Sequence, residues 1–225
     1  MNHEKLYKEN VESVLLISTE HDKGTGFIVR KDGIVLTNHH VVYPSDEVLL
    51  ENRKGEKCEG KVICSNRYLD LACIFPMNNN FRLKRPLPLG DASNINVGRP
   101  VIAIGHPTNS GNFSMTQGIV SATDNDEEIL QLNISGNYGM SGGPVICKEG
   151  KVIGILTNLI YSGQERIEGI SEALPINSII PFLKTVPILS ANIFDYYHYC
   201  PVCGCFAYNG EYYCRCGVTF DYEEK

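Results

Sequence analysis

The chain has 225 residues, with 20 Lys and Arg against 26 Asp and Glu, so its formal net charge at pH 7 is −6. With 43% hydrophobic residues it can bury a sizeable core. Nucleic-acid binding is disfavoured, because backbone phosphates are bound by clustered cations. No apolar run approaches the roughly 20 residues of a membrane span, so we expect no membrane contact.

The order of short apolar runs along the chain predicts an all-β protein. The first ten residues are charged and favour a helix or a loose segment. From residue 13 to 176, β-branched runs alternate with Gly, Asn, Asp and Pro turns, which is typical of two β-barrels rather than of alternating strands and helices. Apolar residues at helical spacing predict a short amphipathic helix over 177–185, with Asn177 at its start.

Three polar segments interrupt this pattern, each beside an apolar run. His39 and His40 follow a strand-like run that ends at Leu36. Asp70 precedes the apolar run 73–75, and Ser141 lies among glycines in Gly139-Met140-Ser141-Gly142-Gly143-Pro144. A histidine, an aspartate and a serine in this order can build a nucleophilic triad. Imidazole takes the serine proton, and the carboxylate fixes the imidazole tautomer.

With these segments the chain resembles chymotrypsin-fold serine peptidases, most closely their HtrA/Deg branch, over about residues 11 to 185. The matching segments occur in the family's order: Gly24-Thr25-Gly26-Phe27-Ile28-Val29, Leu36-Thr37-Asn38-His39-His40-Val41-Val42, Asp70-Leu71-Ala72, Leu87-Pro88-Leu89-Gly90-Asp91, Val97-Gly98, Val101-Ile102-Ala103-Ile104-Gly105, Gly118-Ile119-Val120-Ser121, the Ser141 loop and Val152-Ile153-Gly154-Ile155. The resemblance implies two trypsin-like antiparallel barrels of six strands.

The resemblance also implies roles for the three polar segments. His40 is the expected base, since the family's histidine directly precedes the Val41-Val42 pair, whereas His39 stays an alternative base. Asp70 is expected to orient His40, and Ser141 to be the nucleophile. The backbone N–H groups of Gly139 and Ser141 are expected to form the oxyanion hole.

Two departures from the family's secreted members bear on activation and specificity. Met140 stands where many of them carry an aspartate that pairs with a newly cut N-terminus, so activation by propeptide cleavage is not expected. Ser135 falls at the expected base of the substrate pocket, where trypsin-like enzymes that cut after Lys or Arg have a carboxylate. Segments 157–159 and 171–173 are expected to form the pocket walls, through Thr157, Leu159, Ser171 and Ala173. Glu172, in the second segment, could project into the pocket. We expect a small or medium uncharged residue before the scissile bond.

A second domain is expected at the C-terminus, over 191–225, after a peptidase domain of 1–190. Cys200, Cys203, Cys214 and Cys216 are expected to bind one structural Zn²⁺ in a ribbon, with Cys205 as a fifth candidate ligand. The second pair is Cys-x-Cys rather than the usual Cys-x-x-Cys. The family's usual PDZ module is not expected, since the tail is too short for it. Its many tyrosines favour docking of a protein, such as a regulatory or sensor partner.

A cytoplasmic location is the expectation from the chain start and the cysteines. The polar first ten residues are not expected to form a signal peptide. Nine cysteines cannot all pair, and Cys58, Cys64, Cys73 and Cys147 are scattered singly. The sequence therefore predicts an intracellular serine endopeptidase, whose 135–140 loop rests in an inactive shape until a partner binds. The alternative is a catalytically silent peptidase fold that acts as a protein-binding adaptor.

Overall fold

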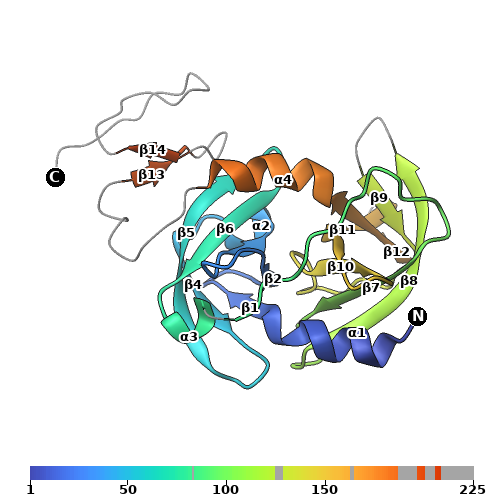
Figure 1. Cartoon of the computed structure of the whole chain (residues 1–225), viewed down its shortest axis with the longest axis horizontal. Helices are drawn as coiled ribbons and strands as arrows, with labels where there is room; N and C mark the ends of the chain where they lie inside the picture. The colour runs from blue at the N-terminus through green and yellow to red at the C-terminus, as the bar shows by residue number, and fades with distance from the viewer. Residues whose placement is uncertain (83, 125–128, 163–164, 187–196, 201–205, 209–225) are drawn as a thin grey trace.

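Two closed antiparallel β-barrels of six strands each make up the molecule (Figure 1). The computed structural model describes residues 1–82, 84–124, 129–162, 165–186, 197–200 and 206–208. The prediction of an all-β protein with two trypsin-like barrels is confirmed.

The N-terminal barrel closes in the strand order β1-β2-β3-β6-β5-β4. Its strands are β1 (Val14–Ser18), β2 (Lys23–Ile28), β3 (Val35–Thr37), β4 (Glu47–Glu51), β5 (Lys57–Asn66) and β6 (Leu71–Pro76). Short helices accompany it: α1 (His3–Asn10), the 3-10 turn η1 (Val11–Ser13), α2 (His39–Val42) and α3 (Asn79–Arg82). Because β3 pairs with β6, the ends of these two strands bring the residues after Thr37 beside the residues before Leu71.

The C-terminal barrel closes in the order β10-β11-β12-β9-β8-β7. Its strands are β7 (Pro100–Gly105), β8 (Ser114–Asp124), β9 (Ile129–Leu132), β10 (Pro144–Cys147), β11 (Val152–Ser162) and β12 (Glu165–Pro175). The Ser141 loop connects β9 to β10, and the start of β10 pairs with β11. This pairing holds the loop's C-terminal end against the barrel.

Three apolar clusters fill the molecule, one inside each barrel and one between them. Strand β6 is buried on both faces: Leu71, Cys73 and Phe75 belong to the cluster between the barrels, and Ala72 and Ile74 to the N-terminal barrel interior. This alternation follows from the two-residue period of a strand. Burying each of the larger side chains contributes about 1.5–3 kcal/mol.

Helix α4 (Ile176–Thr185) covers the cluster between the barrels, on the side opposite α1 (Figure 1). Its buried residues Ile176, Ile179, Phe182 and Leu183 follow the helical spacing. The predicted helix over 177–185 is therefore confirmed, and it begins one residue earlier, after Pro175. Of the helix or loose segment expected for the first ten residues, the structure has the helix, α1.

Only a small part of the predicted zinc ribbon falls on described residues. Strands β13 (Tyr197–Tyr199) and β14 (Phe206–Tyr208) pair as a two-stranded antiparallel sheet, and Cys200 directly after β13 is buried. Cys203, Cys205, Cys214 and Cys216 lie outside the described residues. In the described ranges, no helix combines the length and apolar character of a membrane span.

Candidate active site

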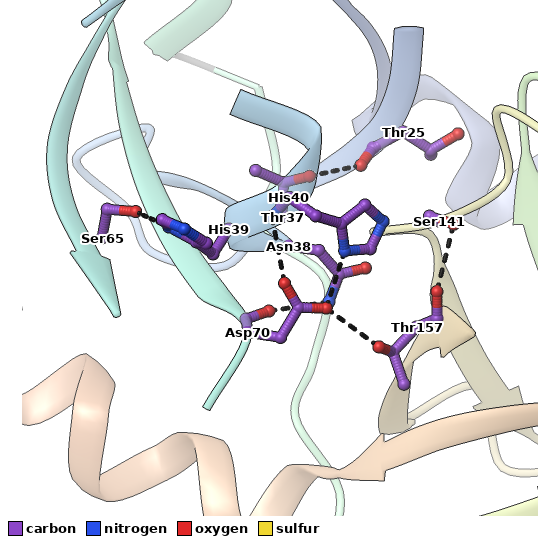
Figure 2. Close-up of polar contacts among 9 residues, drawn as sticks. All are labelled: Thr25, Thr37, Asn38, His39, His40, Ser65, Asp70, Ser141 and Thr157. Carbon is purple, nitrogen blue, oxygen red and sulfur yellow. Dashed lines mark hydrogen bonds and ion pairs between the residues drawn. The ribbon is translucent and has the colours of Figure 1, made fainter. Parts of the chain in front are cut away.

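His40 and Asp70 are joined by two hydrogen bonds where the α2 and β5–β6 segments meet (Figure 2). The Nδ1 atom of His40 lies 2.8 Å from Oδ2 of Asp70, and the His40 backbone N–H donates to Oδ1 at 3.0 Å. A carboxylate on Nδ1 fixes the proton there and leaves Nε2 free as a base. The His40 side chain is 41% exposed, so a substrate can reach the ring.

Local backbone structure carries Asp70 to this position. Asn66 ends β5, and its side-chain oxygen accepts hydrogen bonds from the N–H groups of Tyr68 and Leu69, which closes the turn. Asp70 has a φ of 50°, a left-handed conformation that Asp tolerates better than most residues, and its carbonyl accepts a hydrogen bond from the Asn38 amide. Such uncommon backbone conformations concentrate at functional sites.

His39 faces away from this pair (Figure 2). Its Nδ1 atom lies 2.6 Å from the hydroxyl of Ser65, and its ring packs 5.2 Å from that of Tyr43. Burial lowers the pKa of His39, while Asp70 opposes and His40 and Arg67 add to the shift. His39 therefore has the contacts of a structural histidine rather than those of the base.

Ser141 lies beside the His40 ring in the loop between β9 and β10 (Figure 2). Its hydroxyl donates to the backbone carbonyl of Thr157 at 3.1 Å rather than to His40. A rotation about the Ser141 Cα–Cβ bond, between staggered rotamers, would redirect the hydroxyl. The structure brings His40, Asp70 and Ser141 together, with the serine hydroxyl in a resting orientation.

The N–H group of Gly139 donates no hydrogen bond to any described residue. The carbonyl on the other side of that peptide, from Tyr138, accepts from the N–H of Thr108 at 2.9 Å. Because a trans peptide is planar, its N–H points opposite to its C=O. The Gly139 N–H is therefore held away from Thr108 and is available to a ligand.

The N–H group of Ser141 is likewise without a hydrogen-bond partner among the described residues. The Met140 carbonyl of the same peptide accepts from the N–H of Gly143 at 3.0 Å, which fixes its orientation. Two free N–H groups in one loop, two residues apart, can stabilise a negatively charged oxygen. Control of the 135–140 loop by a partner, which the sequence led us to expect, stays a prediction.

Thr157 contacts both Asp70 and Ser141, a position that sequence reasoning missed. Its hydroxyl donates to Oδ2 of Asp70 at 3.0 Å, while its carbonyl accepts the Ser141 hydroxyl. The sequence pattern placed Thr157 in a pocket wall. A hydroxyl within an apolar strand gives no sequence signal for contact with a carboxylate 87 residues earlier.

The other predicted pocket residues lie on β12 and in the segment before Gly139. Ser171 is fully buried, and its hydroxyl donates to the Ile134 carbonyl and accepts from the Gly136 N–H. Ala173 is also fully buried, while Ser135 is exposed. The backbone of Leu159 pairs with Ser171, but its side chain lies outside the described residues. The pocket assignment stays a prediction.

Metal-ligand clusters are missing from the described part of the chain: nowhere in it do three or more His, Cys, Asp or Glu side chains gather around one point. A base held by a carboxylate, a neighbouring hydroxyl and two free N–H groups are the parts of a serine-nucleophile site. Together with two six-stranded barrels, they define a chymotrypsin-like architecture.

Comparison with known proteins agrees with this architecture. Residues 24–155 match the family model described as the trypsin-like peptidase domain, which is more than half of the chain. The chain belongs to the trypsin-like peptidase family.

Its relatives include HtrA and Deg proteases. A probable periplasmic serine endoprotease DegP-like of Hahella chejuensis is 37% identical over 160 residues, covering 68% of this chain and 33% of the relative. Serine endoprotease DegS of Haemophilus influenzae is 33% identical over 172 residues, covering 72% of this chain and 49% of the relative. The chain thus spans between a third and a half of the length of these two relatives.

Solved structures give the same picture. The HtrA-type protease AlgW with tripeptide superposes with a TM-score of 0.74 at 26% identity, covering 83% of this chain and 64% of that one. A serine endoprotease from Yersinia pestis superposes with a TM-score of 0.70 at 27% identity, covering 83% of this chain and 66% of that one. The predicted resemblance to the HtrA/Deg branch is confirmed for the peptidase domain.

The predicted cytoplasmic location is wrong by this comparison, because the DegP-like relatives are named periplasmic. The cysteine argument was weak for a physical reason. Cys58 and Cys147 are buried inside the barrels and Cys73 between them, and burial raises the pKa of the Cys73 thiol to about 12. Buried structural thiols react little with oxidants in any compartment, so these residues do not report on location.

Proposed function

We propose that the chain is a serine endopeptidase that hydrolyses peptide bonds of protein substrates. The observation that carries the proposal is the pair of hydrogen bonds from His40 to the Asp70 carboxylate, with the histidine ring beside Ser141 (Figure 2). The membership in a family of serine endoproteases supports it. The relatives' names also support a periplasmic location for the reaction.

In the proposed reaction, Ser141 is the nucleophile and His40 the general base. The Ser141 hydroxyl turns from the Thr157 carbonyl to Nε2 of His40, which takes its proton as the oxygen attacks the substrate carbonyl. The protonated His40 then gives that proton to the leaving amine, and an acyl-enzyme remains on Ser141. A water molecule, deprotonated by His40, hydrolyses the acyl-enzyme and restores the serine.

Asp70 and the two free N–H groups lower the barriers of these steps. The carboxylate stabilises the imidazolium that forms when His40 takes the proton. The N–H groups of Gly139 and Ser141 are proposed to bind the oxyanion of the tetrahedral intermediate, where loss of one donor typically costs about a hundred- to a thousandfold in rate.

Zinc binding and partner docking by residues 191–225 remain part of the proposal. Four thiolates from Cys200, Cys203, Cys214 and Cys216 would hold Zn²⁺ tetrahedrally and stabilise a tail too small for a hydrophobic core of its own. The zinc has no part in the proposed hydrolysis. The proposed partner of the tail is a protein rather than a nucleic acid, because the tail has few of the cations that bind backbone phosphates.

Hydrolysis of casein by the wild-type chain and by Ser141→Ala tests the proposed function. We expect the wild type to cleave casein and Ser141→Ala to lose activity by a factor on the order of a million, to background. Equal cleavage by both proteins would reject the proposed nucleophile. Cleavage by neither protein would contradict an enzyme that is active on its own, and would favour the silent adaptor or the resting 135–140 loop that waits for a partner.

A further inference from the structure

Thr25 is a fully buried residue of β2 whose polar groups reach across from the N-terminal barrel to the Ser141 loop. Its hydroxyl donates to the Gly139 carbonyl at 2.6 Å and accepts from the His106 N–H at 2.9 Å. Its backbone N–H donates to the Ser141 carbonyl at 2.8 Å, and its carbonyl accepts the Thr37 hydroxyl at 2.7 Å (Figure 2). Every polar group of Thr25 is thus bonded, and two of the bonds hold the loop.

The two peptides that Thr25 holds alternate with the two that carry the proposed oxyanion donors. Thr25 binds the carbonyls of peptides 139–140 and 141–142. The free N–H groups belong to peptides 138–139 and 140–141. Because peptides are planar, turning one of them changes the backbone dihedrals that it shares with its neighbours. Fixing peptides 139–140 and 141–142 therefore restricts peptide 140–141 from both sides and peptide 138–139 from one side.

The loop needs such an external support because it contains glycines in left-handed conformations. Gly139 has a φ of 90° and Gly142 a φ of 84°. Glycine enters other backbone regions at little cost, so these positions do not fix the turn by themselves. At Gly142 a Cβ atom would lie 2.0 Å from the Thr25 carbonyl oxygen, which shows how closely the loop packs on Thr25.

We propose that Thr25 is a positioning residue that keeps the N–H groups of Gly139 and Ser141 directed at the oxyanion. The proposal rests on the proposed peptidase function. The Thr25 hydroxyl is buried and bonded to backbone, so its effect on catalysis passes through the loop. Loss of the hydroxyl should affect the transition state more than substrate binding, because the oxyanion forms only as the reaction proceeds.

The test compares Thr25→Val, which keeps the side-chain shape, with Thr25→Ser, which keeps the hydroxyl. Fluorescein-labelled casein gives apparent kcat and KM for each protein. We expect Thr25→Val to lower kcat about tenfold to a hundredfold with KM within about twofold, since small displacements of catalytic groups have effects of this size. Thr25→Ser should restore kcat to within about threefold of wild type, because it restores the bond to Gly139.

Ser13→Ala is the matched control for the loss of a buried hydroxyl. Ser13 is buried, and its hydroxyl donates to the Arg85 carbonyl at 2.5 Å, a backbone acceptor outside the Ser141 loop. Its kcat should equal that of the wild type. Thermal unfolding confirms that each variant is folded. If Thr25→Val does not fold, Thr25→Cys takes its place, since a thiol is a weak donor.

Hydrogen–deuterium exchange of residues 137–143 gives a readout that does not depend on activity. The amides of Met140, Gly142 and Gly143 are hydrogen-bonded in the loop, and we expect them to exchange faster in Thr25→Val and at the wild-type rate in Thr25→Ser. Unchanged kcat in a folded Thr25→Val beside an active wild type would overturn the role of Thr25 and leave the proposed function intact. If the wild type itself were inactive, the proposed function would fail. The role of Thr25 would then be overturned by unchanged hydrogen–deuterium exchange in Thr25→Val.

Discussion

Asp70 binds His40 at both the ring and the backbone, and this makes the carboxylate a sensitive point for substitution. In Asp70→Asn the amide can donate to Nδ1, which moves the ring proton to Nε2 and removes the base. We predict that kcat for casein falls by roughly four orders of magnitude, with the free energy of unfolding changed by less than about 2 kcal/mol. Steady-state hydrolysis and urea denaturation measure the two quantities.

Asp91→Asn is the control for this substitution. The Asp91 carboxylate bonds Ser93 and Asn177 instead of the site, so its variant should keep the wild-type kcat. Full activity of Asp70→Asn would contradict the orientation of His40 by Asp70.

His39 gives a prediction about pH, because burial lowers its pKa below the ordinary value of 6.5. As the pH falls below about 6.5, the unfolded state binds a proton that the folded state resists, so the free energy of unfolding decreases. The wild type should therefore lose more stability between pH 7 and pH 5 than His39→Asn does. Urea denaturation at both pH values measures this difference, and equal losses would contradict it.

The main site residues could be predicted from the sequence, whereas the residues that support them could not. His40, Asp70 and Ser141 lie in segments with a recognisable order. Thr25 and Thr157 act through hydrogen bonds to carbonyls and carboxylates far away in the chain, and a threonine in a strand has no pattern that predicts such a partner. The choice of His40 over His39 came from the resemblance, through the Val41-Val42 pair that follows it, and in the structure His40 rather than His39 bonds Asp70 (Figure 2).

At the scale of elements, Asn177 joins α4 to the segment that connects the barrels. Its side-chain oxygen accepts from the Ala92 N–H at 2.7 Å, and its amide donates to Asp91 and Ser93 at 2.9 and 2.7 Å. The sequence predicted Asn177 as the helix N-cap, but Pro175 occupies that position. The asparagine is used for a contact 84 to 86 residues away instead.

We predict that Asn177→Ala lowers the free energy of unfolding by about 1–2 kcal/mol, since it removes bonds worth about 1 kcal/mol each that are partly replaced by water. Urea denaturation measures the change, and kcat of the folded protein should stay at the wild-type value. Lys184→Ala, an exposed change on the same helix, is the control and should change stability by less than about 0.5 kcal/mol. If Asn177→Ala were as stable as Lys184→Ala, the hydrogen bonds of Asn177 would not stabilise the attachment of α4.

Strand existence could be predicted from apolar runs, but strand neighbours could not. β3 pairs with β6 rather than with β4, and β7 pairs with both β8 and β10. Closure of a barrel depends on hydrogen bonds between residues far apart in the chain, which local composition does not specify. The resemblance to a known fold, rather than periodicity, supplied the two barrels.

At the scale of the whole molecule, the predicted zinc ribbon of residues 191–225 is open to a direct measurement. Chain purified without chelator should contain about one Zn²⁺ per molecule by elemental analysis, as four thiolates bind one metal ion. Cys203→Ser should lose most of the zinc, and Cys58→Ser, which changes a buried barrel thiol, should keep it. A zinc-free wild type, even after refolding with Zn²⁺, would contradict the prediction.

The most direct test of the central claim is labelling of the native chain with a fluorophosphonate, followed by mass spectrometry of the labelled peptide. Such a probe reacts with a serine whose hydroxyl is activated by a base and whose oxyanion is stabilised. We predict a single adduct on Ser141, which is absent in Ser141→Ala and in His40→Ala and present in His39→Ala. An adduct on another residue, or an unlabelled wild type, would contradict the account.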